Sequence, residues 1–230
     1  MKKTPVIYDV GLHDGEDSAY YLAKGFRVVG IDADSAQCAL CRGRFAREIA
    51  SGRMHVLNVG VGAEEGMGRF FVSTRNPAVS TFVEPDLSGQ EWELREVPVR
   101  KLSSIIDAFG EPHFVKIDVE CYDHLVLRDL MTSGVRPRFI SAESHVIDVF
   151  CMLVCMNYKK FRLVDGATIP ERFGNHTIQT SYCGSMSYNF RRRSSGPFGE
   201  DLPDQWIDKE QCLKNLLQHG LGWIDIHATC

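Results

Sequence analysis

The sequence predicts a single α/β domain with a doubly wound, mostly parallel sheet and helices on both faces, in a Rossmann-like arrangement. Short apolar runs alternate with helix-length segments from residue 6 to residue 165, and strands that alternate with helices form parallel sheets. The run at residues 113–120 is rich in apolar residues and ends in two acids, as expected of a parallel strand covered on both faces. With 230 residues the chain is long enough for one domain with a full core.

The first strand–helix–strand unit predicts a nucleoside site. A strand at residues 6–10 leads into the turn Gly11-Leu-His-Asp-Gly15, a helix at residues 16–24 follows, and the second strand ends at Asp32. Glycines let the backbone approach a ligand closely, and a carboxylate at the tip of the second strand can bind both ribose hydroxyls. The turn lacks the Gly-x-Gly-x-x-Gly pattern of NAD-binding sites, and Asp9 and Asp14 would repel a pyrophosphate. These acids suit a cationic ligand with a ribose and an amino-acid tail, which describes S-adenosylmethionine.

The next elements extend to residue 110. Asp34 is expected to cap a helix that ends at Gly52, before a strand at residues 54–59 and a hairpin arm at residues 69–73. Residues 74–92 are polar and rich in Pro and Ser, and we expect them to form a loop over the ligand. Residues 96–100 are predicted to form a short edge strand, because Pro98 cannot donate a ladder hydrogen bond. Ser103 or Ser104 is expected to cap the short helix that follows.

The second half continues the alternation up to residue 165. Strands are expected at residues 113–120, 138–143 and 160–165, with one helix capped by Asp123 and another at residues 147–156. Residues 166–204 lose this regularity, and a segment this long without clear structure is either functional or disordered. A helix at residues 206–219 and a strand at residues 222–227 follow. We therefore divide the domain, residues 1–230, into a cofactor-binding core at 6–165, a substrate lid at 166–204, and a C-terminal helix and strand at 205–230.

The composition is that of a soluble globular protein, with 44% hydrophobic residues, 24% charged residues and a net charge of −4. This charge gives no reason to expect nucleic-acid or membrane binding. The longest apolar stretch, residues 146–156, is too short to span a bilayer, and no signal peptide is recognisable, so we expect a cytoplasmic protein. The eight cysteines are expected to be reduced and buried. Zinc binding is disfavoured because its candidate ligands fall on predicted helices; these are Cys38, Cys41, Cys151 and Cys155.

Polar side chains follow the ends of several predicted strands. In an open α/β sheet the ligand binds beyond the carboxyl ends of the strands, at the point where the strand order reverses. The side chains expected to converge there are Asp9 to Asp14, Asp32, Asp118 with Glu120, and Glu143 with His145. A single acidic strand end is common, but several in one alternating fold indicate one shared crevice.

Four segments of the chain resemble the successive motifs of the FkbM-type methyltransferases. They are Tyr8-Asp-Val-Gly-Leu-His-Asp-Gly15, Arg27-Val-Val-Gly-Ile-Asp32-Ala, Val115-Lys-Ile-Asp-Val-Glu-Cys-Tyr-Asp-His124 and Arg138-Phe-Ile-Ser-Ala-Glu143. The resemblance covers residues 6–165 and extends more loosely to residues 195–203 and 223–227. It implies a class I fold, S-adenosylmethionine as cofactor, and O-methylation of hydroxyls on sugars, polysaccharides or polyketides. The chain departs from the family at Cys121, where the family usually has glycine, so the substrate rim beside Glu120 is expected to differ.

The resemblance also assigns cofactor contacts to individual positions. They are Asp9, Gly11, His13, Asp14 and Gly15 in the first motif, Asp32 at the ribose, Asn58 and Val59 beside the adenine, and Asp118 near the methionine part and the reacting methyl. Two of these residues have structural alternatives. Asp9 can brace the turn through backbone hydrogen bonds, and Asn58 can serve ordinary turn chemistry. His13 is expected to shape the cofactor pocket.

Transfer of a methyl group to a hydroxyl needs a group that helps to remove the proton. The candidates are Glu120, Glu143 and His145, and His145 is the preferred base because its unperturbed pKa suits neutral pH. Its alternative is a structural histidine at a helix start. We expect no metal, although Asp118, Glu143 and His145 could together bind a divalent ion.

The acceptor is expected to be a small molecule or a glycan. The basic cluster at residues 191–193 lies near Tyr182, Tyr188 and Phe190, and aromatic faces with flexible polar neighbours suit a lid over a sugar. A solvated charged surface is the alternative for the basic cluster. Two other functions remain: a catalytically silent S-adenosylmethionine-binding module, and an NAD(P)-binding oxidoreductase. No feature of the sequence predicts the oligomeric state.

Overall fold

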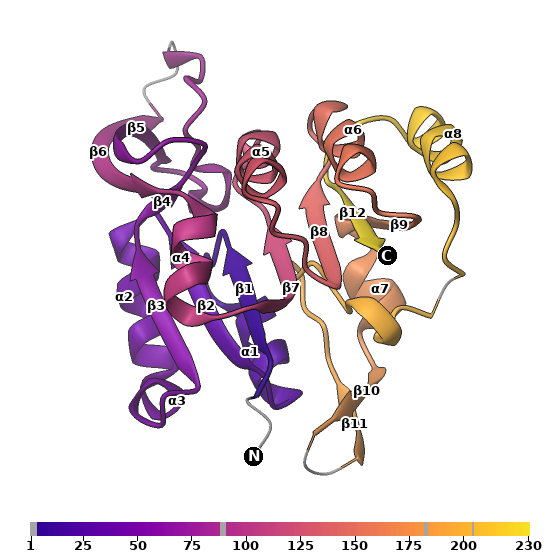
Figure 1. Ribbon diagram of the computed structural model, residues 1–230. Helices are drawn as coiled ribbons and strands as arrows, with labels where there is room; N and C mark the ends of the chain where they lie inside the picture. The colour runs from indigo at the N-terminus through magenta and orange to yellow at the C-terminus, as the bar shows by residue number, and fades with distance from the viewer. Residues whose placement is uncertain (1–3, 88–90, 182–183, 204) are drawn as a thin grey trace.

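The computed structural model describes residues 4–87, 91–181, 184–203 and 205–230, and in this part of the chain the central sheet has seven strands (Figure 1). In spatial order the strands are β3 (Met54–Asn58), β2 (Arg27–Asp32), β1 (Val6–Val10), β7 (Pro112–Ile117), β8 (Phe139–Glu143), β12 (Ile224–Thr229) and β9 (Lys160–Asp165). The first five are parallel to one another, and β12 is antiparallel to both of its neighbours. The predicted doubly wound, mostly parallel sheet is confirmed.

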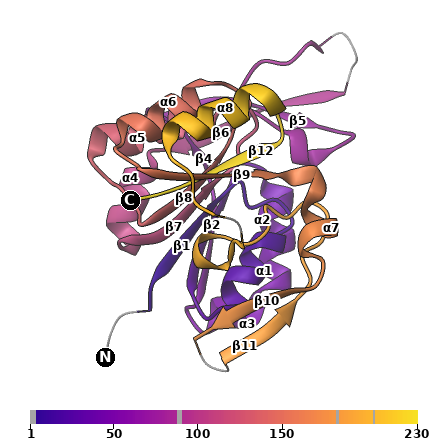
Figure 2. The ribbon, with the colours of Figure 1, turned by 90° about the vertical axis from the view of Figure 1, so that its right-hand side faces the viewer.

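Helices cover both faces of the sheet, as predicted, and Figure 2 shows the two layers from the side. One face packs against α4 (Leu102–Phe109), α5 (Asp123–Ser133), α6 (Asp148–Cys155) and α8 (Lys209–His219). The other packs against α1 (Glu16–Ala23), α2 (Ser35–Arg44), α3 (Ala46–Ala50) and α7 (Ile169–Phe173). Successive side chains of a strand point to opposite faces, so Ile7 belongs to one apolar cluster and Tyr8 and Val10 to the other.

A second, three-stranded sheet adjoins the carboxyl end of the main one. Its order is β4 (Gly60–Val61), β6 (Trp92–Arg100) and β5 (Gly66–Ser73). The predicted edge position of the Pro98 strand is wrong, since β6 is the middle strand. Proline is tolerated because β4 is only two residues long and pairs with Val99 and Arg100. Pro98 therefore pairs on one side alone among the described strands.

The structure confirms the predicted cap of α2 and corrects three other predictions about helices. The helix expected from residue 35 to Gly52 is interrupted at Phe45, which separates α2 from α3. Asp34 caps α2 as predicted, through the backbone N–H of Ala36. Ser103 does not cap α4, because its hydroxyl and backbone N–H both donate to Asp129 on α5. Asp123 is the first residue of α5 instead of its N-cap, and its carboxylate accepts the backbone N–H of Glu143.

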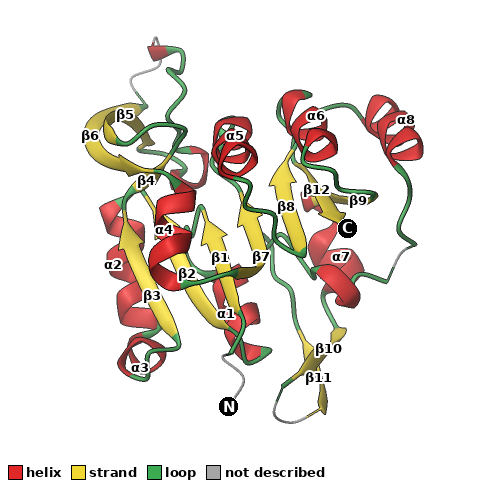
Figure 3. Cartoon of the chain, viewed as in Figure 1, coloured by secondary structure: helices red, strands yellow, loops and turns green. Residues whose placement is uncertain are grey.

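The expectation of an irregular segment at residues 166–204 is wrong for much of its length. Residues 169–173 form α7, and β10 (His176–Thr180) pairs with β11 (Gly184–Tyr188) in an antiparallel hairpin. Both strands are only five residues long and mostly polar, so they leave little periodicity in the sequence. In Figure 3 this hairpin lies at the opposite end of the main sheet from the three-stranded sheet.

The C-terminal helix and strand are confirmed, with shifted bounds. Asp208 caps α8 by accepting the backbone N–H of Gln211, so the helix begins at Lys209 instead of residue 206. The expectation that the cysteines are buried is wrong for the exposed Cys230, for the half-buried Cys121, and for Cys151 and Cys155, which are exposed on α6. These two cysteines and the Cys38–Cys41 pair lie on helices at opposite ends of the sheet (Figure 1). No helix in the described ranges is both long and apolar enough to cross a membrane.

Candidate active site

A cavity of about 570 Å³ opens beyond the carboxyl ends of the parallel strands, where the strand order reverses between β1 and β7. The predicted site residues that line it are Gly11, His13, Asp14, Asp32, Val59, Asp118, Glu120, Glu143 and His145. Three other predicted residues, Asp9, Gly15 and Asn58, do not line it. The structure thus brings most of the predicted site together at the expected edge of the sheet.

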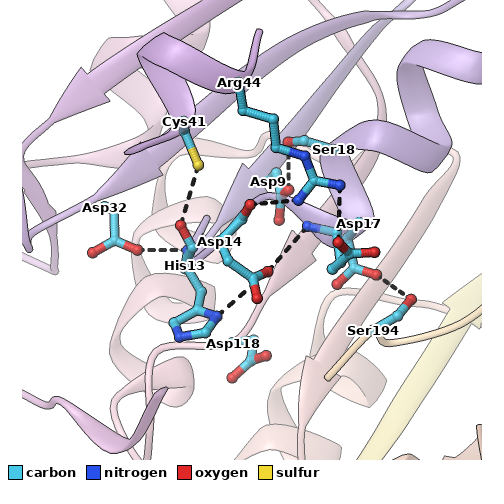
Figure 4. Close-up of polar contacts among 12 residues, drawn as sticks. Asp9, His13, Asp14, Asp17, Ser18, Asp32, Cys41, Arg44, Asp118 and Ser194 are labelled. Carbon is cyan, nitrogen blue, oxygen red and sulfur yellow. Dashed lines mark hydrogen bonds and ion pairs between the residues drawn. The ribbon is translucent and has the colours of Figure 1, made fainter. Parts of the chain in front are cut away.

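The β2 end of the cavity is organised by backbone hydrogen bonds to Asp32 (Figure 4). One carboxylate oxygen of Asp32 accepts the backbone N–H of His13 at 2.8 Å, and the other accepts that of Asp34 at 2.8 Å. Burial is the main influence on this carboxyl and raises its pKa, while the two backbone donors lower it. The carboxylate is therefore fixed in orientation and keeps lone pairs toward the cavity, as a ribose ligand requires.

The turn after β1 brings the backbone close to the ligand position. Gly11 has φ of 88°, and a Cβ at this position would lie 1.7 Å from the carbonyl oxygen of Asp118. Only glycine fits here, because β1 and β7 converge at the cavity floor. Gly15 also has positive φ, and a Cβ there would meet the ring of Phe45 instead of the cavity. A hydrogen bond with His13 is the largest cause of a lowered pKa at Asp14, which keeps that carboxylate ionised on the wall.

Asp9 lies beneath the cavity in a buried network centred on Lys116. The Nζ of Lys116 lies 3.1 Å from Asp118, 3.6 Å from Asp17 and 3.7 Å from Asp9, and all but Asp118 are almost fully buried. Asp9 also accepts the hydroxyl of Ser18 at 2.6 Å. It thus braces the strand and the first helix through side chains, which differs from the alternative considered for it, a brace of the turn through backbone hydrogen bonds.

The sequence analysis did not single out Lys116 or Asp17. Lys116 is a charged residue inside an otherwise apolar strand, and this was the available signal. Asp17 accepts the hydroxyl of Ser194 at 2.6 Å and the backbone N–H of Ser195 at 2.9 Å, so it ties the late segment to α1 (Figure 4). Such a contact between residues far apart in the chain has no sequence pattern.

Asn58 and Val59 at the end of β3 have different positions. The side-chain amide of Asn58 donates to the backbone oxygens of Asp32 and Ala33, both at 3.1 Å. This is the turn chemistry considered as its alternative. Val59 lines the cavity beside Asp32 and Ala33, so an apolar wall lies where the adenine was expected.

The β8 end of the cavity gathers Glu120, Glu143 and His145. The Nδ1 of His145 lies 3.1 Å from Oε2 of Glu143, and its Nε2 lies 4.0 Å from Oε2 of Glu120. Burial, and next the charge of Asp118, raises the pKa of Glu120 to about 7 and that of Glu143 to about 10. A positively charged ligand at this end would favour the ionised carboxylates.

The segment that carries Glu120 has an unusual backbone. Glu120 and Cys121 have φ of 51° and 69°, the left-handed region that favours glycine. The hydroxyl of Thr81 donates to the carbonyl oxygen of Glu120 at 2.6 Å and holds this turn against the loop above it. Cys121 therefore occupies a position whose conformation explains why glycine would be preferred.

The rim of the cavity combines two segments with different origins. Residues 75–80 and Phe82, from the loop predicted to cover the ligand, line one side, and Arg192 and Arg193 line the other. Tyr188 does not reach the cavity, since its ring packs 5.4 Å from that of Tyr20 and 4.9 Å from that of Phe190. Tyr182, also predicted to contact the acceptor, lies outside the described residues.

A family model described as the methyltransferase FkbM domain matches residues 9–153, more than half of the chain. A search of curated proteins finds no match. Among solved structures, the chain resembles the methyltransferase FkbM from Methylobacillus flagellatus KT, with 19% identity, a TM-score of 0.48, and coverage of 70% of this chain and 40% of that chain. This chain therefore spans about two fifths of that protein's length.

Two further solved structures are more distant. The precorrin-6y C5,15-methyltransferase from Geobacter metallireducens GS-15 is 12% identical, with a TM-score of 0.39 over 82% of this chain and 76% of that chain. The glycopeptide N-methyltransferase MtfA, complexed with S-adenosyl-L-homocysteine, is 11% identical, with a TM-score of 0.35 over 99% of this chain and 83% of that chain.

Proposed function

The chain belongs to the FkbM methyltransferase family, and we propose that it transfers the methyl group of S-adenosylmethionine to a hydroxyl of a saccharide or a glycosylated metabolite. The observation that carries this proposal is the order of the side chains across the sheet. The neighbouring strands β3, β2, β1, β7 and β8 each contribute one residue to one cavity, at the last position of the strand or directly after it. In that order the residues are Val59, Asp32, Gly11, Asp118 and Glu143.

This order fits an extended nucleoside cofactor. Asp32 would hold the ribose hydroxyls, Val59 would contact the adenine, and the close approach at Gly11 would let the cofactor lie against the backbone. Asp118, beyond β7, would hold the amino-acid tail. A cavity of about 570 Å³ is within the usual range for ligands of this size. When bound, the cofactor supplies an electrophilic methyl carbon.

The acceptor would bind at the β8 end of the cavity. There the chain must align a hydroxyl with the sulfonium bond and help to remove its proton. Glu120, Glu143 and His145 line this end, and we assign the handling of that proton to this cluster. Because the acceptor would bind at the β8 end, the Asp32 end would bind the cofactor alone.

The late segment contributes to acceptor binding through its basic part. Arg192 and Arg193 line the cavity, and the bonds of Asp17 to Ser194 and Ser195 place them over α1. Their charges and flexible side chains suit a polar or phosphorylated acceptor. The loop at residues 75–82 covers the opposite side of the same opening.

Calorimetric titration and a turnover assay test the proposal. We expect S-adenosylhomocysteine to bind to the chain and NAD to show no binding. We also expect S-adenosylhomocysteine to form when S-adenosylmethionine is supplied with a panel of free and phosphorylated saccharides. Preferred binding of NAD would support the oxidoreductase instead, and cofactor binding without turnover of any acceptor would support the silent module.

A further inference from the structure

The geometry points to a divalent-cation site formed by Glu120, Glu143 and His145 at the β8 end of the cavity. One ligand atom from each of these residues lies within 4.8 Å of the other two. From the sequence we expect no metal, and the alternative ligand set there contains Asp118 instead of Glu120. The three residues come from two separate segments, so their spacing in the chain does not show that they meet.

The contact between Glu143 and His145 has the length expected of two ligands on one ion. An ion that binds its ligands at about 2.1 Å places neighbouring ligand atoms about 3 Å apart. Oε2 of Glu143 and Nδ1 of His145 lie 3.1 Å apart. Glu120 would be the third ligand. Its side chain is 23% exposed on the cavity wall, and its Oε2 lies 4.0 Å from Nε2 of His145, so the side chain would have to rotate to reach an ion bound to Nδ1.

Neither Oε2 of Glu143 nor Nδ1 of His145 makes a hydrogen bond to any residue that the structure describes, and they form an ion pair with each other only when His145 is protonated. Glu143 is only 3% exposed, so water does not solvate its Oε2. A buried carboxylate oxygen without a partner is costly, and buried charges are normally paired or bound to a metal. In the tautomer that carries its proton on Nε2, His145 offers the lone pair of Nδ1, and a cation between Nδ1 and Oε2 would then satisfy both atoms.

The donor set and its surroundings select the class of ion. Two carboxylates and one imidazole suit a divalent cation such as Mn²⁺ or Mg²⁺. Asp118, Asp123 and Asp225 also lie close enough to affect the charge of Glu143, against one lysine, Lys116. This end is therefore rich in carboxyls, and a cation bound among them would favour their ionised forms.

The role of the ion in the reaction rests on the proposed function. Glu120, Glu143 and His145 would hold the ion, which would supply Lewis-acid chemistry that lowers the pKa of the acceptor hydroxyl, and the hydroxyl proton would pass to solvent in the cavity. His145 would then act as a ligand and not as the general base. Cation binding itself does not depend on this step.

The site can be tested by counting bound Mn²⁺ with electron paramagnetic resonance, using the metal-free chain without any cofactor. We expect one Mn²⁺ per chain, with affinity at least tenfold lower in Glu143→Gln and in His145→Gln. The matched control is Glu84→Gln, which removes an exposed carboxylate outside the cavity and should leave the affinity unchanged. Circular dichroism checks the fold, and Glu120→Gln on the open wall replaces any variant that fails to fold.

Three results would overturn the inference: no Mn²⁺ binding at millimolar concentration, equal binding by the variants, or displacement of Mn²⁺ by saturating S-adenosylhomocysteine. Displacement would mean that these carboxylates hold the ammonium group of the cofactor. The same titrations separate the two proposals. Cofactor binding without Mn²⁺ binding refutes the cation site alone, whereas Mn²⁺ binding without cofactor binding refutes the proposed function alone.

Discussion

At the β2 end of the cavity, both carboxylate oxygens of Asp32 accept backbone N–H groups, whereas at the β8 end Oε2 of Glu143 accepts no hydrogen bond from any described residue. Both carboxyls follow parallel strands of the same sheet. The first is oriented by the chain itself, so it is ready before any ligand arrives. The Glu143 carboxyl lies close to His145, and no described residue fixes its Oε2 through a hydrogen bond. This arrangement suits a group that binds a cation or takes part in proton removal.

The backbone that shapes the Asp32 end gives the largest expected effect. Replacing Gly11 with alanine would place a Cβ 1.7 Å from the carbonyl oxygen of Asp118 at φ of 88°. We expect Gly11→Ala to lower the free energy of unfolding by at least about 3 kcal/mol, measured by urea denaturation. Gly43→Ala on α2 is the control, because its Cβ would meet nothing within 4 Å and should stabilise by at most about 1 kcal/mol. Equal stability of Gly11→Ala and the unmodified chain would contradict the close approach of β1 and β7.

Replacing each of the two carboxyls in turn separates the functions of the two ends of the cavity. Asp32→Ala should weaken S-adenosylhomocysteine binding at least tenfold, because a hydrogen bond to a charged group contributes about 1.5–3 kcal/mol, while the domain remains folded. Glu143→Gln should keep the affinity for this ligand within a few-fold. Calorimetry measures both affinities, and thermal unfolding shows that both variants fold. The reverse pattern would place the ribose at the β8 end.

β12 pairs with β8 and carries the buried imidazole of His227. Acid should therefore lower the free energy of unfolding through this residue. Burial, and next the charge of Arg162, lowers the pKa of His227 to about 3, against about 6.5 in an unfolded chain. The stability that depends on neutral His227 is therefore complete above pH 6.5 and falls as the pH drops toward 3. By pH 4.5 the loss should be about 1–3 kcal/mol.

His227→Phe isolates this effect, because phenylalanine keeps a ring facing Phe114 and removes the titration. We expect the variant to gain stability relative to the unmodified chain as the pH falls from 7 to 4.5, in urea denaturation at both pH values. His219→Asn, which changes an exposed histidine, should show no such gain. A parallel decline of His227→Phe and the unmodified chain would assign the acid sensitivity to other groups.

The two ends also differ in how far the sequence predicts them. The Asp32 end is built from neighbours in the chain: a glycine turn, a helix cap at Asp34 and the end of one strand, all of which leave a local pattern. The predicted alternation of strands and helices is confirmed for the same reason. At the β8 end, the positions of Glu120 and His145 depend on a left-handed turn and on strand neighbours far apart in sequence.

Long-range contacts explain the errors as well. Pro98 was assigned to an edge, because the two-residue strand beside it has no sequence signal. Residues 169–188 were expected to be irregular, although a short helix and a hairpin form there against α1 and its neighbours. The cofactor contacts expected of Asp9 and Asn58 stay predictions, although neither residue lines the cavity, and a motif does not distinguish a carboxyl in the cavity wall from one bonded to Ser18 beneath it.

The position of β12 has a consequence for how this protein is made. Residues 224–229 form β12, which pairs with β8 on one side and with β9 on the other. β8 and β9 therefore cannot be joined in one sheet until the ribosome has released residues 224–229. The nascent chain must keep the open edge of β8 from pairing wrongly while some eighty further residues are translated. Contacts across such separations slow folding, and exposed strand edges invite association with other chains. The part of the sheet that contains β8 and β9 therefore cannot be completed until β12 has been synthesised.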